Sequence, residues 1–442
     1  MKLIIKGGTV VNADAGPGVP GAPYPSGKLD LLIENGVITE ISERIAMEAH
    51  GQAVDVIDAT GHMILPGLVD AHCHLRDPGL EYKEDIETGT ASAAAGGFVA
   101  VACMPNTEPV TDNAEIIKYI LNKAELSGYV KVLPIGSVSK GQRGEELSEI
   151  GEMKFAGAVA ISDDGRPVSS PSLMKKALLY SKMFDIPVIS HCEDLDLADG
   201  GDMNEGYVSL ELGLRGVPSV AESVQVARDV LLSEYTGVPI HIAHVSTEAS
   251  VNLIRDAKRR GVRVTCETCP HYFTLTDKAC LGYDTNAKVN PPLAGEKDVA
   301  AVRAGLADGT VDLIATDHAP HHADEKNVEF SSAAKGLVGF ETAFGLAYTN
   351  LVLTGVLTLA QLAEKMSRNP ARLLKLDGAG AITRGGPAHL TIIDPERRYT
   401  VEPERFLSKS KNSPFGGFTL QGAVAYTIVG GKPVVRQGVL LE

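Results

Sequence analysis

The sequence has no apolar run long enough to span a lipid bilayer, so no membrane-spanning helix is expected. The apolar run within residues 1–8 is too short for a secretory signal peptide. No low-complexity tract is present, and no internal repeat beyond a strand–helix unit. We therefore expect a cytoplasmic protein, whose 442 residues are enough for one large domain and a smaller module.

Positive charge is in deficit. The 41 Lys and Arg residues stand against 56 Asp and Glu residues, which gives a formal net charge of −15. This charge repels phosphate backbones and anionic lipid headgroups, so we expect neither nucleic acid nor a membrane as a partner. A small anionic substrate stays compatible with it, because bound cations and a nearby arginine can reverse the local field.

Cysteine is also scarce, with six residues scattered along the chain. In a cytoplasmic protein these are expected to be free thiols rather than a disulfide framework. Residues 266–269 read Cys-Glu-Thr-Cys, but no second Cys-x-x-Cys exists to complete a zinc knuckle. We interpret these two cysteines as thiols at a strand end.

What the sequence does contain is a regular alternation of short β-branched or Ala/Val-rich runs with longer helical patterns. This alternation predicts parallel strands joined by right-handed crossovers, and eight such strands predict an α/β fold, a (β/α)8 barrel of the TIM type. The expected strands are 63–70, 97–104, 129–136, 155–162, 186–191, 238–244, 261–267 and 311–317. The expected helices between them are 112–126, 172–184, 219–235, 246–260 and 296–305.

The two ends of the chain have a different pattern, with short strands broken by Gly-rich turns. We expect both ends to fold together as a small β-sandwich that flanks the barrel. The predicted domains are 1–62 for the N-terminal part of the sandwich, 63–375 for the barrel and 376–442 for the C-terminal part. The expected strands of the ends are 2–11, 31–41, 53–58, 380–394 and 423–441.

His72 and His74 lie where an apolar run ends. Because strand side chains alternate between faces, both imidazoles emerge on one face and can chelate one cation, although such a pair can also line a polar strand face. Four further apolar runs end in a carboxylate or an imidazole, and in a barrel of this type the carboxyl ends of the strands carry the active site. The six candidate metal ligands are His72, His74, Asp164, His191, His244 and Asp317.

A catalytic cation usually takes about three protein ligands, so six ligands suggest two cations that share a bridge. A carboxylate bridges best, and residues 163–165 offer Asp163 and Asp164, between which strand parity does not choose. Either aspartate could instead cap a turn. Asp317 could move a proton from an attacking water to a leaving nitrogen, or act as a plain ligand or a helix cap.

Three further side chains could bind a substrate at the same rim. Arg76 follows the histidine pair at the same strand parity and suits bidentate capture of a carboxylate, unless it pairs with a neighbouring acid. Asn106 and His321 follow the second and eighth strands, where a plain surface loop is the alternative. The polar stretch 318–336 is either a solvated loop or a lid over the site.

At this point the sequence resembles a known family. Residues 72–79 (His-Cys-His-Leu-Arg-Asp-Pro-Gly), 104–106 (Met-Pro-Asn), 163–165 (Asp-Asp-Gly), 203–206 (Met-Asn-Glu-Gly), 270–271 (Pro-His) and 315–320 (Ala-Thr-Asp-His-Ala-Pro) are similar to those of class I bacterial dihydroorotases, a group of the amidohydrolase superfamily. The similarity covers nearly the whole chain. It implies reversible, zinc-dependent cyclisation of N-carbamoyl-L-aspartate to L-dihydroorotate in pyrimidine synthesis.

The resemblance also implies roles for individual residues. His72, His74 and Asp317 would hold one zinc ion, His191 and His244 a second, and Asp164 would bridge them. The implied substrate contacts are His74, Arg76, Asn106, Asn290, His321 and the backbone of Gly336.

The chain departs from the family pattern at three places. Many relatives bridge their metals with a carboxylated lysine, whereas Lys154 is expected at the wrong end of its strand, which leaves Lys140 as the substitute. Residues 333–336 read Ala-Ala-Lys-Gly where relatives often have Ala-Pro-Phe-Gly, which affects the lid contacts. His389 replaces the usual Asp of a C-terminal strand, which should affect the sandwich alone.

Two rival functions follow from the same resemblance. A hydantoinase or allantoinase would use the same metals on another cyclic amide, but a hydantoin lacks the carboxylate that Arg76 would bind. An inactive structural partner of aspartate transcarbamoylase would have lost metal ligands, and all six candidates persist here. Some active class I members also assemble with that transcarbamoylase, and we expect a homo-oligomer.

Overall fold

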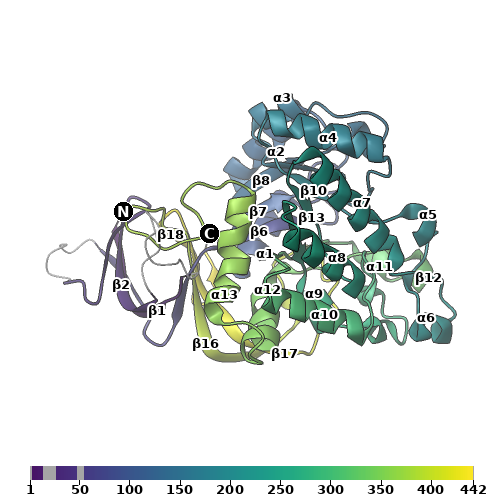
Figure 1. The fold of residues 1–442 in the computed structure, drawn as a ribbon. Coiled ribbons are helices and arrows are strands. Elements are labelled where there is room, and N and C mark those ends of the chain that lie inside the picture. The colour runs from purple at the N-terminus through teal and green to yellow at the C-terminus, as the bar shows by residue number, and fades with distance from the viewer. Residues whose placement is uncertain (1, 13–25, 47–53, 442) are drawn as a thin grey trace.

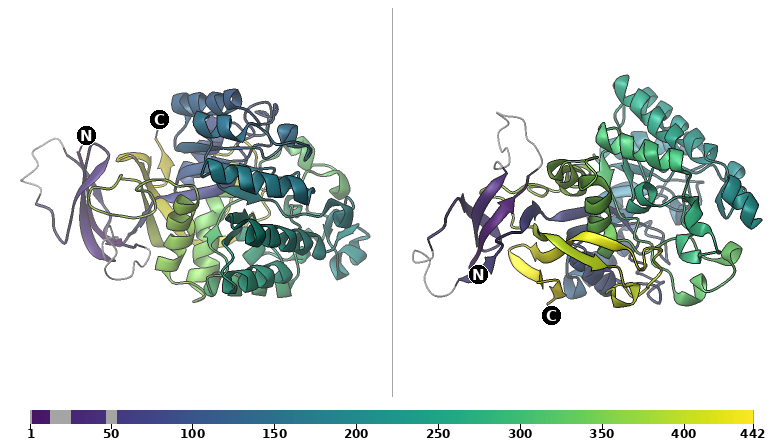
Figure 2. Two further views of the ribbon diagram at one scale, coloured as in Figure 1. Left: turned by 45° about the horizontal axis from the view of Figure 1, so that its top comes forward. Right: turned by 90° about the horizontal axis from the view of Figure 1, so that it is seen from below.

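The computed structural model describes residues 2–12, 26–46 and 54–441. Its main body is a parallel barrel surrounded by helices, and a second sheet made from both chain ends projects from one side of it (Figures 1 and 2). Among the described residues, no helix combines the length and the apolar character needed to cross a bilayer.

The barrel consists of eight strands that are hydrogen-bonded in sequence order and run parallel. The first and last strands meet through a parallel bridge between Cys73 and His318, and the Asp317 amide donates to the His72 carbonyl at 3.0 Å. The predicted fold class is therefore confirmed. The strands are β6 (Leu68–Cys73), β7 (Phe98–Cys103), β8 (Lys131–Gly136), β9 (Ala160–Ser162), β10 (Val188–Ser190), β13 (Ile240–Ile242), β14 (Val264–Thr268) and β15 (Leu313–Ile314).

Helices cover the outside of the barrel, and the five predicted ones are present with shifts of a few residues (Figure 1). In the second helix, Asn113 caps the first turn by accepting from the amides of Glu115 and Ile116, and Ile117 and Ile120 are its buried face. The α-helices are α1 (Ile86–Ala95), α2 (Ala114–Ser127), α3 (Ile150–Ala156), α4 (Pro171–Met183), α5 (Leu195–Ala198), α6 (Tyr207–Leu212), α7 (Val220–Thr236), α8 (Glu248–Arg259), α9 (Pro270–Thr274), α10 (Glu296–Ala307), α11 (Ala323–Lys326), α12 (Phe340–Ala347), α13 (Leu359–Ala363) and α14 (Asn369–Leu373).

All predicted barrel strands are present, several of them are shortened, and two include residues of another element. The run 63–70 is split at Gly67: β5 (Met63–Pro66) belongs to the second sheet, and the barrel begins at β6. A Cβ at Gly67 would lie 2.5 Å from the side chain of Val99, so a larger residue does not fit where the chain passes between the sheets. The run 155–162 is also shortened, because α3 extends to Ala156 and ends at Gly157, whose φ of 118° is left-handed.

The second sheet is mixed, combines both chain ends and has nine strands within the residues that the structure describes. Asn12 joins the ends directly, because its amide donates to the Ile382 carbonyl and accepts from the Ile382 amide. Apolar side chains from both ends share one buried cluster, so the prediction that the ends fold together is confirmed, although their strands form one continuous sheet. Residue 53 of the predicted strand 53–58 lies outside the described residues. Besides β5, the strands are β1 (Lys2–Val10), β2 (Gly27–Glu34), β3 (Val37–Ser42), β4 (Asp55–Asp58), β16 (Leu390–Thr400), β17 (Thr419–Val429), β18 (Lys432–Arg436) and β19 (Val439–Leu440).

The exact domain boundaries at 62/63 and 375/376 stay predictions. Outside the barrel and the end sheet, β11 (Met203–Asn204) and β12 (Gly216–Val217) form a two-stranded parallel sheet in the excursion between β10 and α7. The carboxyl ends of the barrel strands thus form one rim, which is where the sequence places its candidate ligands.

Candidate metal centre

All six predicted metal ligands are buried at the carboxyl ends of barrel strands. His72 lies in β6 and His74 directly after it, while the other four follow β9, β10, β13 and β15 by one to three residues. Because parallel strands end at a common rim, residues that are far apart in sequence meet there. The structure therefore brings together His72, His74, Asp164, His191, His244 and Asp317.

The ligand atoms form two groups with one shared member. His72, His74 and Asp164 have one ligand atom each within 4.8 Å of one another, and the same holds for Asp164, His191 and His244. Oδ1 of Asp164 lies 3.4 Å from His72 Nε2, His191 Nδ1 and His244 Nε2, and its Oδ2 lies 3.5 Å from His74 Nε2. Asp164 thus has the placement of a bridging carboxylate.

Asp317 joins the first group. Its Oδ1 lies 3.1 Å from His74 Nε2 and 3.5 Å from His72 Nε2. Its backbone φ is 46°, and Arg76 and His244 also have positive φ values of 59° and 31°. Left-handed backbone is uncommon for residues other than glycine, although Asp and His adopt it more readily than most, and it tends to occur at functional sites. Three residues of this rim therefore hold their side chains in place at a conformational cost.

The donor chemistry of these groups fits divalent cations. Imidazole nitrogen and carboxylate oxygen are the usual ligands of zinc and related metals. Nε2 of His72 and Oδ1 of Asp164 are buried and have no hydrogen-bond partner among the described residues. Since buried polar atoms normally have a partner, these two atoms indicate that a bound cation belongs between the groups.

The other bridge candidates lie outside the centre. Oδ1 of Asp163 accepts from the amides of Val138 at 2.7 Å and Ser139 at 3.1 Å, so this carboxylate fastens the loop after β8. Lys140 lies at the surface, with Nζ 3.4 Å from Glu146. Lys154 lies in α3 and not at the start of a strand, which corrects the expectation from the sequence.

The charges of the centre support one another. Burial opposes ionisation of Asp164, but the charge of His72 and the nearby imidazoles of His191 and His244 outweigh it and hold the pKa of Asp164 well below its usual range. Burial likewise opposes the charged form of His191, but Asp164 and Glu193 raise its pKa to about 9. The pKa of Asp317 is lowered in the same way, since the charges of His72 and His74 overcome the effect of burial. The centre therefore carries anionic carboxylates, as a cation site requires.

Two carboxylates that the sequence did not suggest orient His72 and His191. Oε1 of Glu267 lies 2.7 Å from His72 Nδ1, and Oε2 of Glu193 lies 3.2 Å from His191 Nε2. Burial opposes ionisation of Glu267, but hydrogen bonds from His241 and His72 keep its pKa well below the usual range. A single acidic residue belongs to no motif whose spacing would mark it as part of a metal site. The available clue was that Glu267 also stands at the end of a barrel strand, between the two cysteines of 266–269.

The predicted substrate residues surround the first group. Arg76 is 8% exposed, its Nε donates to the Pro320 carbonyl at 3.1 Å, and its Nη2 lies 3.3 Å from His321 Nε2. Oδ1 of Asn106 lies 2.8 Å from His74 Nδ1. Arg76 and His321 are therefore buried at the rim beside the candidate ligands, and the half-buried Asn106 is held there by its contact with His74.

Gly336 lies beside this group, where only glycine fits. Its φ is 145°, and a Cβ would lie 2.8 Å from the carbonyl oxygen of Ala319 and 3.1 Å from the His321 ring. Asn412, which the sequence did not suggest, donates to the Gly336 and Ala319 carbonyls and accepts from the His321 amide.

The segment 318–336 is packed onto the protein. Phe330 is buried, and Nζ of Lys326 donates to the carbonyls of Thr285 and Ala334, while Nζ of Lys288 donates to that of Phe330. These contacts anchor the segment to residues 285–288, so it is not a fully solvated loop, and its role as a lid over the site stays a prediction.

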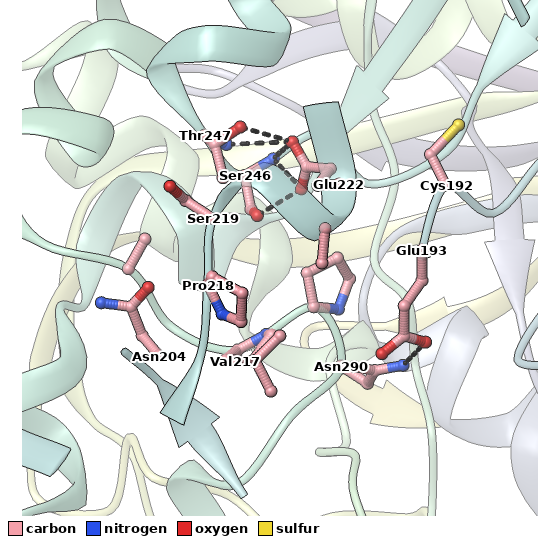
Figure 3. Close-up of a pocket in the computed structure, with 14 residues that line it drawn as sticks. Cys192, Glu193, Asn204, Val217, Pro218, Ser219, Glu222, Ser246, Thr247 and Asn290 are labelled. Atoms are coloured by element: carbon pink, nitrogen blue, oxygen red, sulfur yellow. Dashed lines mark hydrogen bonds between the residues drawn. The ribbon is translucent and has the colours of Figure 1, made fainter. Parts of the chain in front are cut away.

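Asn290 lies on the other side of the centre. Its Nδ2 donates to Glu193 at 3.0 Å, and both side chains line a pocket (Figure 3). On the opposite wall of that pocket, Glu222 accepts from the amides and hydroxyls of Ser246 and Thr247. These bonds fix the loop that follows His244.

The fold and the centre together define a class of enzyme. Among solved structures, the chain is similar to an L-hydantoinase from Arthrobacter aurescens, with a TM-score of 0.88, 26% identity and coverage of 100% of this chain and 97% of that one. It also shares its fold with a dihydropyrimidinase from Brevibacillus agri, with a TM-score of 0.85, 23% identity and coverage of 100% and 96%. With its six buried candidate ligands, the chain is a metal-dependent cyclic amidohydrolase.

Sequence relatives narrow the class. A family model described as dihydro-orotase-like matches residues 61–250. A dihydroorotase from Acetivibrio thermocellus is 64% identical over 439 residues, which cover 99% of this chain and 100% of that protein. A dihydroorotase from Ruminiclostridium cellulolyticum is 61% identical over 441 residues and is covered completely. The chain belongs to the dihydroorotase family.

Proposed function

We propose that the protein catalyses the reversible cyclisation of N-carbamoyl-L-aspartate to L-dihydroorotate, as a step of pyrimidine synthesis, with two zinc ions per chain. The observation that carries the proposal is the buried Arg76 beside a two-group ligand set that shares Asp164. The family relationship supports the same reaction.

In this proposal His72, His74 and Asp317 would hold one ion, His191 and His244 would hold the other, and Asp164 would be shared between them. Bound zinc would supply Lewis-acid polarisation of the amide carbonyl that is attacked. The carboxylate of Asp317 accepts a proton from the attacking water and returns it to the leaving ring nitrogen. In the direction of ring closure the same carboxylate takes the proton from the attacking nitrogen.

Arg76 and Asn106 position the substrate. The guanidinium suits a carboxylate because its planar fork donates two parallel hydrogen bonds. The remaining proposed substrate contacts are His74, Asn290, His321 and the backbone of Gly336. In this proposal the segment 318–336 covers the site and keeps bulk water away from the substrate. A hydantoin has no carboxylate for Arg76, which is the physical reason for preferring dihydroorotate over the substrates of the structural relatives.

The deciding experiment compares turnover of L-dihydroorotate, hydantoin and allantoin by the purified chain with and without added zinc. We expect zinc-dependent turnover of dihydroorotate and far lower rates with the other two. Turnover of hydantoin or allantoin as fast as that of dihydroorotate would refute the substrate assignment. A chain that binds zinc but turns over none of the three would point to the inactive structural partner.

Association with aspartate transcarbamoylase, homo-oligomerisation and a cytoplasmic location stay predictions. Running the protein alone and with that transcarbamoylase over a size-exclusion column with light-scattering detection would test the first two.

A further inference from the structure

A line of polar side chains, all buried except the half-buried Thr265, runs through the barrel interior to the metal centre. Oγ1 of Thr265 lies 2.8 Å from His241 Nδ1, His241 Nε2 lies 3.1 Å from Glu267 Oε2, and Glu267 Oε1 lies 2.7 Å from His72 Nδ1. Glu267 and His72 are 0% exposed and His241 is 1% exposed. The line thus joins a ligand of the first group to the core of the barrel.

The strand register explains this arrangement. Thr265 and Glu267 are two residues apart in β14, so their side chains share one face. His241 lies opposite Thr265 in the neighbouring strand β13. Glu267 then reaches past β15 to contact His72 in β6, since β15 separates these strands in the sheet order.

Glu267 is fully used by these contacts. A carboxylate only accepts hydrogen bonds, and each of its two oxygens faces one imidazole nitrogen. A buried charge is costly unless it is paired and hydrogen-bonded. Glu267 is therefore placed to accept a hydrogen bond from His72 Nδ1. It is not itself a member of either ligand group.

We propose that Glu267 is a positioning residue of the metal centre: it holds His72 with the proton on Nδ1, so that the lone pair of Nε2 points at the cation. A hydrogen bond to one ring nitrogen fixes which nitrogen binds metal, and it raises the basicity of the ligand. His241 keeps Glu267 in place from the other side. The inference rests on the proposed zinc function.

We expect metal binding at the first group to depend more on the contact between His72 and Glu267 than on the contact between His74 and Asn106. His74 Nδ1 faces the neutral amide of Asn106 at 2.8 Å, which can orient the ring but adds no negative charge. Glu267 brings a full charge to His72 in a site without solvent contact. Loss of that charge should therefore weaken metal binding at the first group and leave the second group, held by His191 and His244, less affected.

The test is Glu267→Gln, which preserves the shape of the side chain and removes its charge. We expect zinc affinity of the first group, measured by competition with a chromogenic chelator, to fall by roughly 10- to 100-fold. The rise in Tm on adding limiting zinc should shrink, and excess zinc should restore kcat. Asp30→Asn is the matched control, because Asp30 is a buried carboxylate of the end sheet that accepts from the amides of Gly7 and Ile45.

The outcomes separate the alternatives. If Glu267→Gln lowers the Tm of the zinc-free protein but leaves zinc affinity as in the wild type, Glu267 is merely structural and the inference is overturned. If the wild-type chain itself binds no zinc, the proposed function fails first. Should Glu267→Gln not fold, His241→Phe decides: it removes the second donor to Glu267, and an unchanged zinc affinity in this variant would equally overturn the inference.

Discussion

Arg76→Lys tests the proposed substrate most directly. Nε of Arg76 donates to the Pro320 carbonyl and Nη2 lies next to His321, so the guanidinium is fixed in the rim before any substrate binds. A guanidinium carries five N–H groups, one on Nε and two each on Nη1 and Nη2. Both N–H groups of Nη1 and the second one of Nη2 are then available to an anionic ligand. Lysine keeps the positive charge but has no planar fork.

The size of the effect follows from the lost hydrogen bond. Hydrogen bonds to charged groups contribute about 1.5–3 kcal/mol, so loss of one of two should raise KM for dihydroorotate by roughly 10- to 150-fold. The carboxylate lies apart from the reacting amide, so the contact serves substrate and transition state alike and kcat should change little.

The assay is steady-state kinetics of dihydroorotate hydrolysis at saturating zinc. Arg303→Lys is the control, because Nε of Arg303 donates to the Phe273 carbonyl, away from the ligand groups, and its replacement should leave KM unchanged. A KM for Arg76→Lys within twofold of the wild type would refute the role of Arg76 in carboxylate capture. So would an equal loss of activity toward hydantoin, which has no carboxylate.

Two further predictions concern the metal centre. Asp317→Asn should still bind zinc through His72 and His74, while kcat falls by roughly 10²- to 10⁴-fold because the proton acceptor is lost. Measuring zinc content and turnover in one preparation checks this prediction, and near-normal turnover would rule out the proton-transfer role of Asp317. Removal of zinc by a chelator should abolish activity and lower Tm, since zinc at about 100 times its Kd stabilises the folded state by about 2.7 kcal/mol. Thermal unfolding before and after zinc is restored measures this, and an unchanged Tm would contradict it.

Much of the centre could be predicted from the sequence, because its ligands follow a rule of topology. A parallel barrel brings the carboxyl ends of its strands to one rim, so His191 and Asp317 could be grouped with the histidine pair although they are far apart in the chain. The choice between Asp163 and Asp164 could not be settled from neighbouring positions. It required the contacts of Asp163 with the loop after β8.

Other features depend on tertiary contacts that leave little trace in local sequence. The run 63–70 is apolar up to Val69 apart from Gly67, and although Pro66-Gly67 marks a break, this pair does not show that the two halves join different sheets. The run 155–162 is interrupted by the end of α3, because Gly157 ends a helix there. Glu267 and Glu193 are ordinary acids in the sequence, and only the fold shows that each faces an imidazole of a different ligand group.

The location of these residues also explains how one fold can serve several cyclic amides. At 26% identity the chain still shares nearly its whole backbone with an L-hydantoinase. Its candidate ligands lie in the barrel strands or within three residues of their ends, and Arg76 and Asn106 lie equally close to β6 and β7, whereas Asn290 and His321 lie on longer connecting segments. Loops vary more readily than the scaffold that carries them. Because Arg76 is not a member of either ligand group, discrimination between a substrate with a carboxylate and one without it can change at Arg76 while the ligands keep the metal chemistry.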